Sequence, residues 1–338
     1  MGPGTIPRDR FDYSSAITES WKRQTLLNIV KLRYLDPPIF VDVGQIVAGY
    51  TIESGVNVAG AVSGDPAGAA GGSAASIGGA VRYTDRPTIT YVPMTGNRFV
   101  RALMTPLPPE AVFSALSGGW PADGILGATV NSMNGIHNAR SSLEGITAPD
   151  PRFMRVLQLM REIQDSGALG MRVRKEEPQG AASSLLVVRR RDITPETVAK
   201  GKELRGLLGL DPDAEEFTLV YGGASQGPAE VAVVTRSVLH ILVAMSMGVA
   251  VPEEDIQEGR ASPGLALGEK LGRLITVNCS DSAPGDADAY VVVEYRDRWF
   301  WIDDRDMRSK RAFAFMMMLF TMSDPAQADN APVLTIPT

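Results

Sequence analysis

Two alternating strands around a loop of small residues make residues 50–83 the most constraining part of this 338-residue sequence. Apolar residues fall on alternate positions before and after the loop, which is the period of a β-strand with one apolar face. Polar residues such as Thr51, Glu53 and Arg82 lie between them. The pattern predicts a long Gly/Ala-rich β-hairpin with its turn within residues 64–72. The apolar positions of this predicted hairpin are Tyr50, Ile52, Val56, Val58, Val62, Ile77, Val81 and Tyr83.

A hairpin of this kind needs something to cover its apolar face. Antiparallel sheets are commonly buried on one side, so the hairpin could pack on its own domain or on a neighbouring copy. Its first strand would be about 43 Å long at ~3.3 Å per residue, whereas a strand that crosses a membrane needs only about 9–11 residues. Since lipid tolerates no open sheet edge, crossing would require several copies to contribute hairpins to one ring. The sequence leaves these alternatives open.

The rest of the chain alternates between helical and strand patterns without a strict order. Such interleaving favours an α+β fold of mixed helices and antiparallel strands over a doubly wound parallel sheet. A polar, turn-rich stretch at residues 139–151 predicts a boundary between an N-terminal part, residues 1–140, and a mixed α+β domain, residues 150–338. Helices are expected at residues 12–35, 95–104, 110–116, 150–163, 195–208, 235–247 and 307–322, and strands at 169–174, 185–190, 217–221, 273–277, 289–295 and 299–302.

Composition excludes several classes of function. The formal charge of −6 argues against nucleic acid as a partner, because phosphate binding requires a basic surface. The single cysteine, Cys279, cannot form an internal disulfide, and His137 and His240 are too few for a three-histidine metal site. The longest strongly apolar helical stretch, residues 312–322, is too short to span a bilayer.

Residues 223–227 match the G-x-S-x-G pattern of a nucleophile elbow, with Ser225 as the nucleophile. That chemistry needs an acid and a histidine later in the chain to activate the serine. The only histidine that follows is His240, which lies in an apolar helical pattern and is expected to be a core residue. The sequence therefore predicts no catalytic residue, and a non-enzymatic protein is favoured.

Three carboxylates at Asp303, Asp304 and Asp306 stand where a strand leads into a helix. Clustered carboxylates can hold Ca²⁺ or Mg²⁺. Aspartate at a helix start is also the ordinary cap for free backbone N–H groups, and the calcium-loop spacing is absent. Capping is the favoured interpretation, so neither a metal site nor a cofactor is predicted.

Aromatic residues gather on two predicted strands near the C-terminus. Strand alternation puts Trp299 and Trp301 on one face, and Tyr290 and Tyr295 lie on the preceding strand. Aromatic residues in strands usually anchor cross-strand packing, so a core or subunit contact is favoured. A wall for a bound ligand is the alternative.

Five stretches of the sequence, residues 6–13, 26–34, 85–91, 299–306 and 333–337, carry a resemblance to known proteins. They resemble a family of uncharacterised bacterial envelope proteins, which are predicted lipoproteins. Members of that family carry an N-terminal signal that ends at a lipid-bearing cysteine shortly before the Gly-Pro start. The resemblance implies a location in the periplasm or at the outer membrane, and it brings no catalytic residues.

Three functional hypotheses follow from these patterns. The first is a non-enzymatic envelope protein that forms a homo-oligomer, such as a ring, through the predicted hairpin, with outer-membrane lipid as a further partner. The second is a soluble module that binds a ligand or partner near the aromatic strands. The third and least favoured is a hydrolase that uses Ser225 or the Asp303 cluster.

Overall fold

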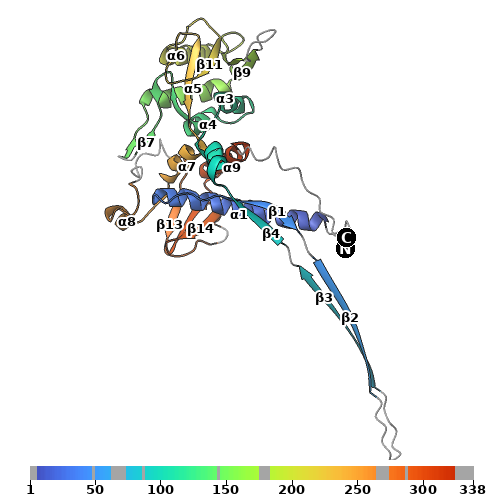
Figure 1. The fold of residues 1–338 in the computed structure, drawn as a ribbon. Helices are drawn as coiled ribbons and strands as arrows, with labels where there is room; N and C mark the ends of the chain where they lie inside the picture. Colours follow the sequence, from blue (N-terminus) through green and yellow to red (C-terminus); the bar gives the residue numbers. More distant parts are fainter. Residues whose placement is uncertain are drawn as a thin grey trace, which may run out of the picture. The chain divides into compact units, whose positions relative to one another are not determined.

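The computed structural model describes residues 6–323 apart from residues 48–49, 62–73, 86–87, 143–144, 175–182, 264–273 and 286–287. The expected α+β class is confirmed, since helices are combined with antiparallel and mixed sheets (Figure 1). The chain divides into two compact units. The smaller comprises Phe40–Met94, and the larger comprises the residues before and after it.

A six-stranded sheet forms one part of the larger unit, in the order β6-β5-β12-β11-β10-β9. Neighbouring strands are antiparallel except β11 and β12, which are parallel. The predicted boundary at residues 139–151 lies inside this unit, because β5 and β6 precede it in sequence and the other four strands follow it. The strands are β5 (Val130–Met133), β6 (Ile136–His137), β9 (Leu169–Arg174), β10 (Ser183–Val188), β11 (Glu216–Tyr221) and β12 (Glu230–Thr235).

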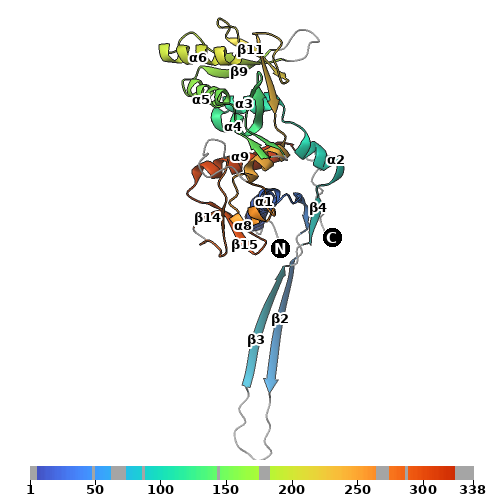
Figure 2. The same ribbon diagram turned by 90° about the vertical axis from the view of Figure 1, so that its left-hand side faces the viewer.

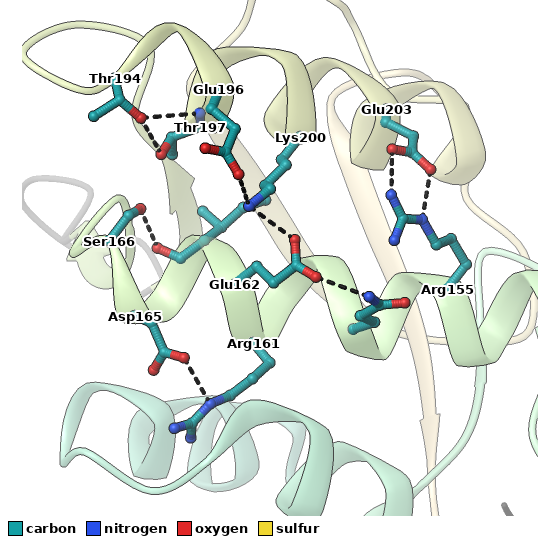
Figure 3. Close-up of polar contacts among 12 residues, drawn as sticks. Arg155, Arg161, Glu162, Asp165, Ser166, Thr194, Glu196, Thr197, Lys200 and Glu203 are labelled. Carbon is teal, nitrogen blue, oxygen red and sulfur yellow. Dashed lines mark hydrogen bonds and ion pairs between the residues drawn. The ribbon is translucent and has the colours of Figure 1, made fainter.

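Four helices accompany this sheet: α3 (Pro109–Ser117), α4 (Ala122–Thr129), α5 (Pro151–Asp165) and α6 (Pro195–Leu208). Helices α5 and α6 begin at side-chain caps, Asp150 and Thr194, each followed by proline in the first turn. The two helices lie side by side and exchange ion pairs (Figure 3). Arg155 binds Glu203 with two contacts of 2.7 Å, and Lys200 lies 3.0 Å from Glu162. The four side chains remain between 26% and 43% exposed, so solvent screens these pairs and they add little to stability.

A second, three-stranded sheet has the order β13-β15-β14 and packs against the first helix, α1 (Ile6–Arg33). The core between them is fully buried and apolar, with Leu26, Ile29 and Val30 from α1 and Phe300 from the sheet. The strands are β13 (Asn278–Ser280), β14 (Ala289–Tyr295) and β15 (Arg298–Asp303), and the remaining elements here are α7 (Val238–Ser246), α8 (Glu253–Gln257) and α9 (Met307–Ser323).

Short elements complete the larger unit. The helix expected at residues 95–104 is a short α-helix, α2 (Gly96–Phe99), that continues as the π-helix η2 (Val100–Met104). Strands β7 (Arg140–Ser142) and β8 (Gly145–Thr147) form a separate hairpin. Within the described ranges, no helix is long and apolar enough to cross a membrane.

Two sequence-based assignments are wrong. The helix expected to start at Thr235 begins at Val238, because Thr235 pairs with Val130 in the sheet and Ser237 caps the helix. The strand expected at residues 273–277 is not formed by its described residues. Val277 makes only an isolated bridge to Val249, and the pairing with β15 begins at Asn278. The apolar residues of this stretch are buried by packing rather than by a ladder.

Candidate assembly arm and its anchor

The smaller unit, residues 40–94, is a pair of two-stranded antiparallel ribbons, which we call the arm. Strand β1 (Val41–Val47) pairs with β4 (Thr88–Pro93), and β2 (Tyr50–Ala61) pairs with β3 (Ala74–Asp85). Figure 2 shows β2 and β3 as two long neighbouring strands. Every residue of β4 is exposed, including Tyr91 at 62%. Among the arm's described residues there is no helix and no third strand in either ribbon.

The register of β2 and β3 places two pairs of the predicted apolar positions directly opposite each other, whereas Tyr50 is opposite Asp85. Ile52 is opposite Tyr83, and Val58 is opposite Ile77. Val56 is opposite Gly79, and Ser54 is opposite Val81. Directly opposite residues in an antiparallel pair occupy the same face. The predicted apolar positions of the two strands therefore share one face; Val62 and the predicted turn lie outside the described residues.

The long strands of the arm carry few features that would block pairing with another strand. Natural edge strands are usually protected by charged residues, proline or bulges. Strands β2 and β3 contain neither lysine nor proline, and their only charged residues are Glu53, Arg82 and Asp85. Glu53 and Arg82 are opposite each other in the register. Among the described residues, neither edge of this ribbon is paired with a further strand.

Strand β9, at the edge of the six-stranded sheet, shows the contrasting case. Within six residues it carries two exposed arginines, Arg172 and Arg174, and both pair with Glu216. Charges on an edge strand oppose the addition of another strand. The chain thus carries such charges on an edge strand of its larger unit, whereas β2 and β3 of the arm contain neither lysine, proline nor a bulge.

A bulge near the start of the arm depends on a glycine. The pairing of β1 with β4 shifts by one residue between Val43 and Gln45. A Cβ atom on the intervening Gly44 would lie 2.8 Å from Cγ2 of Val92, which is closer than side chains approach. Bulges bend a strand and increase its twist, and glycine at this bulge leaves room for the Val92 side chain.

An asparagine holds the residue immediately before the arm. Asn28 lies on the buried side of α1 and is 1% exposed. Its side-chain amide donates to the carbonyl of Ile39 at 2.8 Å and accepts from the N–H of Ile39 at 3.0 Å. At the base of the arm itself, the N–H of Met94 donates to the carbonyl of Phe40 at 2.8 Å. We call Asn28 and the adjoining tyrosine network the anchor.

The tyrosine network surrounds the segment between α1 and the arm. Tyr34 donates to Asp255 at 2.8 Å, and Tyr295 donates to Asp36. Burial, followed by the hydrogen bond to Asp255, raises the pKa of the Tyr34 hydroxyl above its ordinary value. The Arg296 guanidinium lies 4.7 Å from the centre of the Tyr34 ring and 3.3 Å from Asp36. Cation–π and ionic contacts therefore tie the end of α1 to the turn between β14 and β15.

The four aromatic residues considered for a ligand site are divided between two environments. Tyr290 lies 4.4 Å from Nζ of Lys22 and packs edge-on against Phe313, and Tyr295 belongs to the anchor. Trp299 and Trp301 are half-buried and alternate with the buried residues of β15. The structure does not bring the four side chains together, so they do not form one wall.

The residues considered for a hydrolase, Ser225, His240 and the Asp303 cluster, are not joined to one another by any hydrogen bond in the described part of the chain. Ser225 lies in the loop between β11 and β12. His240 is exposed, which corrects the expectation of a core histidine. Its Nδ1 atom lies 3.1 Å from Oγ of Ser237, which caps α7. His240 therefore lies in the first turn of α7, on the exposed side of the helix.

Of the three aspartates before α9, Asp306 caps the helix as expected, since it accepts from the backbone N–H of Arg308 and of Ser309, both at 3.1 Å. Asp303 accepts from the N–H of Arg305 at 2.7 Å, before the helix begins. Asp304 pairs with Lys310 at 2.6 Å. In the part of the chain that the structure describes, no cluster of histidine, cysteine or acidic residues could hold a metal ion.

The anchor was not predicted from the sequence, although one signal for it exists. Asn28 interrupts the apolar run Leu26, Leu27, Ile29 and Val30, and a buried polar side chain requires a hydrogen-bond partner. The sequence does not show which residue is that partner, because Ile39 reaches Asn28 only through the turn that follows α1. The tyrosine network joins segments more than 200 residues apart, as between Tyr34 and Asp255, and has no local signal.

No family model, curated protein or solved structure matches this chain. No residue role can be carried over from a relative. The function is inferred from the arm and its anchor.

Proposed function

We propose that this chain is a non-enzymatic protein of the bacterial cell envelope that self-associates through its arm, with a ring of copies as the assembly. One observation carries the proposal. Strands β2 and β3 pair over twelve positions, and within the described part of their unit no further strand or helix covers them. A two-stranded ribbon alone is marginally stable in water at best, and at least a third strand or a packing partner is needed.

Association supplies what the isolated ribbon lacks. A neighbouring arm can pair with the open edge of a strand and satisfy its backbone N–H and C=O groups. Repetition of the same contact also brings the predicted apolar faces onto one surface. The free energy of this pairing comes from backbone hydrogen bonds and from burial of apolar area, which are the ordinary stabilising terms of a sheet.

The envelope location rests on the family resemblance and on strand length. Each long strand has 12 residues, whereas a tilted strand that crosses a bilayer needs about 9–11. Outer-membrane lipid is therefore included in the proposal as a second partner of the apolar face, and the assembly would lie in the periplasm or at the outer membrane.

Light scattering coupled to size exclusion tests self-association. The intact chain is compared with a variant in which residues 55–80 are replaced by Asn-Gly, which shortens the ribbon but keeps a hairpin turn between the register partners Ser54 and Val81. We expect the intact chain to have a mass several times 36.2 kDa and the shortened variant to have the monomer mass. Val173→Lys on β9 is the matched control and should leave the mass unchanged. Equal monomeric masses for all three proteins would contradict the proposal.

A binding module is the second candidate, and it is favoured by one observation. Trp299 and Trp301 are half-buried on the side of β15 opposite to the buried Phe300. Native mass spectrometry tests this candidate. A small molecule that co-purifies with the intact chain and is lost in Trp299→Ala, while the protein stays monomeric, would favour binding over assembly.

A further inference from the structure

We infer that the arms join head to tail, so that β3 of one copy pairs with β2 of the next copy in an antiparallel sheet. This inference rests on the proposed self-association and specifies its geometry. The two edges of a ribbon are different surfaces, one presented by β2 and the other by β3. Three contacts are therefore conceivable: β2 with β2, β3 with β3, and β2 with β3.

The three contacts differ in whether the paired strands run parallel or antiparallel. In a ring, one rotation relates each copy to the next, so all arms enter the shared sheet from the same side. Because β2 and β3 of one hairpin run in opposite directions, β3 of one copy then meets β2 of its neighbour antiparallel. The like-strand contacts would be parallel in the same arrangement, and parallel pairing is slightly less stable per residue.

The three contacts also differ in which charged residues they place opposite each other. Glu53 and Arg82 stand at the same level of the ribbon, because they are register partners. At the head-to-tail contact without a shift in register, Arg82 of one copy would stand beside the neighbour's Glu53. A parallel in-register contact of β3 with β3 would place two Arg82 residues opposite each other, and one of β2 with β2 would do the same for Glu53. Opposite charges across strands stabilise a pair, and like charges destabilise it.

Closure explains why both edges can remain unprotected. Half of the backbone groups of each strand point away from its partner, which leaves about six N–H groups without a strand partner on each edge. A contact of like strands satisfies one edge and leaves the other open to further addition. The head-to-tail contact uses both edges of every copy, and a closed ring leaves none unpaired. Each sheet edge of one copy is thus incomplete without the next copy.

Disulfide cross-linking between differently tagged copies tests the inference. Cys279 is the sequence's single cysteine, so it is first replaced by serine. Thr51→Cys on β2 and Thr84→Cys on β3 are then made separately, since Thr51 and Thr84 stand at the same level of the ribbon. The two variants are co-expressed and oxidised. We expect a covalent dimer of twice 36.2 kDa that contains both tags and little dimer from either variant alone.

A tilted ring would shift the register, so Thr51→Cys is also combined with Ala80→Cys or Ser76→Cys, which occupy the same face of β3 as Thr84. Val173→Cys, 60% exposed on β9, is the control and should form no dimer with Thr51→Cys. Cross-links between identical variants would overturn the head-to-tail contact. An oligomer without any mixed cross-link across the three β3 positions would also overturn it. A monomer by light scattering would instead overturn self-association itself.

Discussion

Buried polar side chains that bind backbone groups hold together the loops of the larger unit. Asn28 pairs with both backbone groups of Ile39. Arg205, 2% exposed, donates to the carbonyls of Ala214 and Val188. Arg236, 7% exposed, donates to the carbonyls of Gly127, Ala128 and Ala139, and burial lowers its pKa to about 10. Each side chain satisfies carbonyls that no helix or strand would satisfy.

Asn28→Ala should destabilise the larger unit by about 1–3 kcal/mol, because it leaves the N–H and C=O of Ile39 without their partners. Urea denaturation measures this loss as a lower midpoint with an unchanged slope. Gln158→Ala is the matched control, since Gln158 is an exposed helix residue bonded to Glu162. Its effect should stay within about 0.5 kcal/mol. Similar midpoints for both variants would show that Asn28 does not hold the chain before the arm.

Tyr34 gives a pH-dependent test of the anchor. Burial and Asp255 raise the pKa of its hydroxyl above the ordinary value of 10.0, so the folded state favours the protonated form. The resulting contribution to the free energy of unfolding is complete below pH 10.0 and is lost as the pH rises toward the folded-state pKa. We expect the wild type to lose stability more steeply above that pH than Tyr34→Phe. Thermal melts across this range measure the difference, and parallel curves would contradict the anchor.

Elements with local start and stop signals were predictable from the sequence. Helix α6 begins and ends as expected, because Thr194 caps it, Pro195 follows, and Gly209 ends it in the left-handed conformation with φ 65°. Strand β12 was not predicted, since its apolar run leads into α7 after only two residues and its assignment depends on pairing with β11 and β5. The Asn134–Gly135 turn, with φ of 45° and 76°, is a hairpin signal that identifies β5 and β6.

In the candidate site, the faces of the arm's strands were predictable from the sequence, whereas the anchor was not. Strand alternation predicted which residues of β2 and of β3 share a face, because a period of two residues is a local property, whereas the register between the two strands was not predicted. The anchor depends on contacts between distant segments, such as Tyr295 with Asp36, and no local pattern encodes them. The separation of Tyr290 and Tyr295 from the tryptophans depends likewise on how α1 and α9 pack on the small sheet.

The two faces of the arm should respond differently to charge. Val58 lies at a predicted apolar position of β2, and Asn57 is its neighbour on the other face. Val58→Lys should weaken self-association at least about tenfold, because it places a charge in the covered face. Asn57→Lys, which adds the same charge to the same strand, should change it by less than about threefold. Light scattering over a dilution series measures both, and equal effects would contradict a one-sided interface.

At the scale of the whole molecule, the chain combines a larger unit that has a buried apolar core with an arm built from two two-stranded ribbons. The larger unit buries apolar residues on its six-stranded and three-stranded sheets. The arm's order, in contrast, should depend on protein concentration, because an association equilibrium stabilises only the assembled form. Function in this protein is therefore expected to reside in the arm.

Hydrogen exchange of the arm's backbone amides at increasing protein concentration tests the central claim most directly. In a single copy, about half of the amides of β2 and β3 point away from the partner strand and should exchange rapidly. On assembly these outward amides gain partners from neighbouring copies, so we predict that their exchange slows as the concentration rises, while exchange in α5 and β12 stays unchanged. Exchange in β2 and β3 that is independent of concentration, in a sample whose mass increases by light scattering, would contradict assembly through the arm.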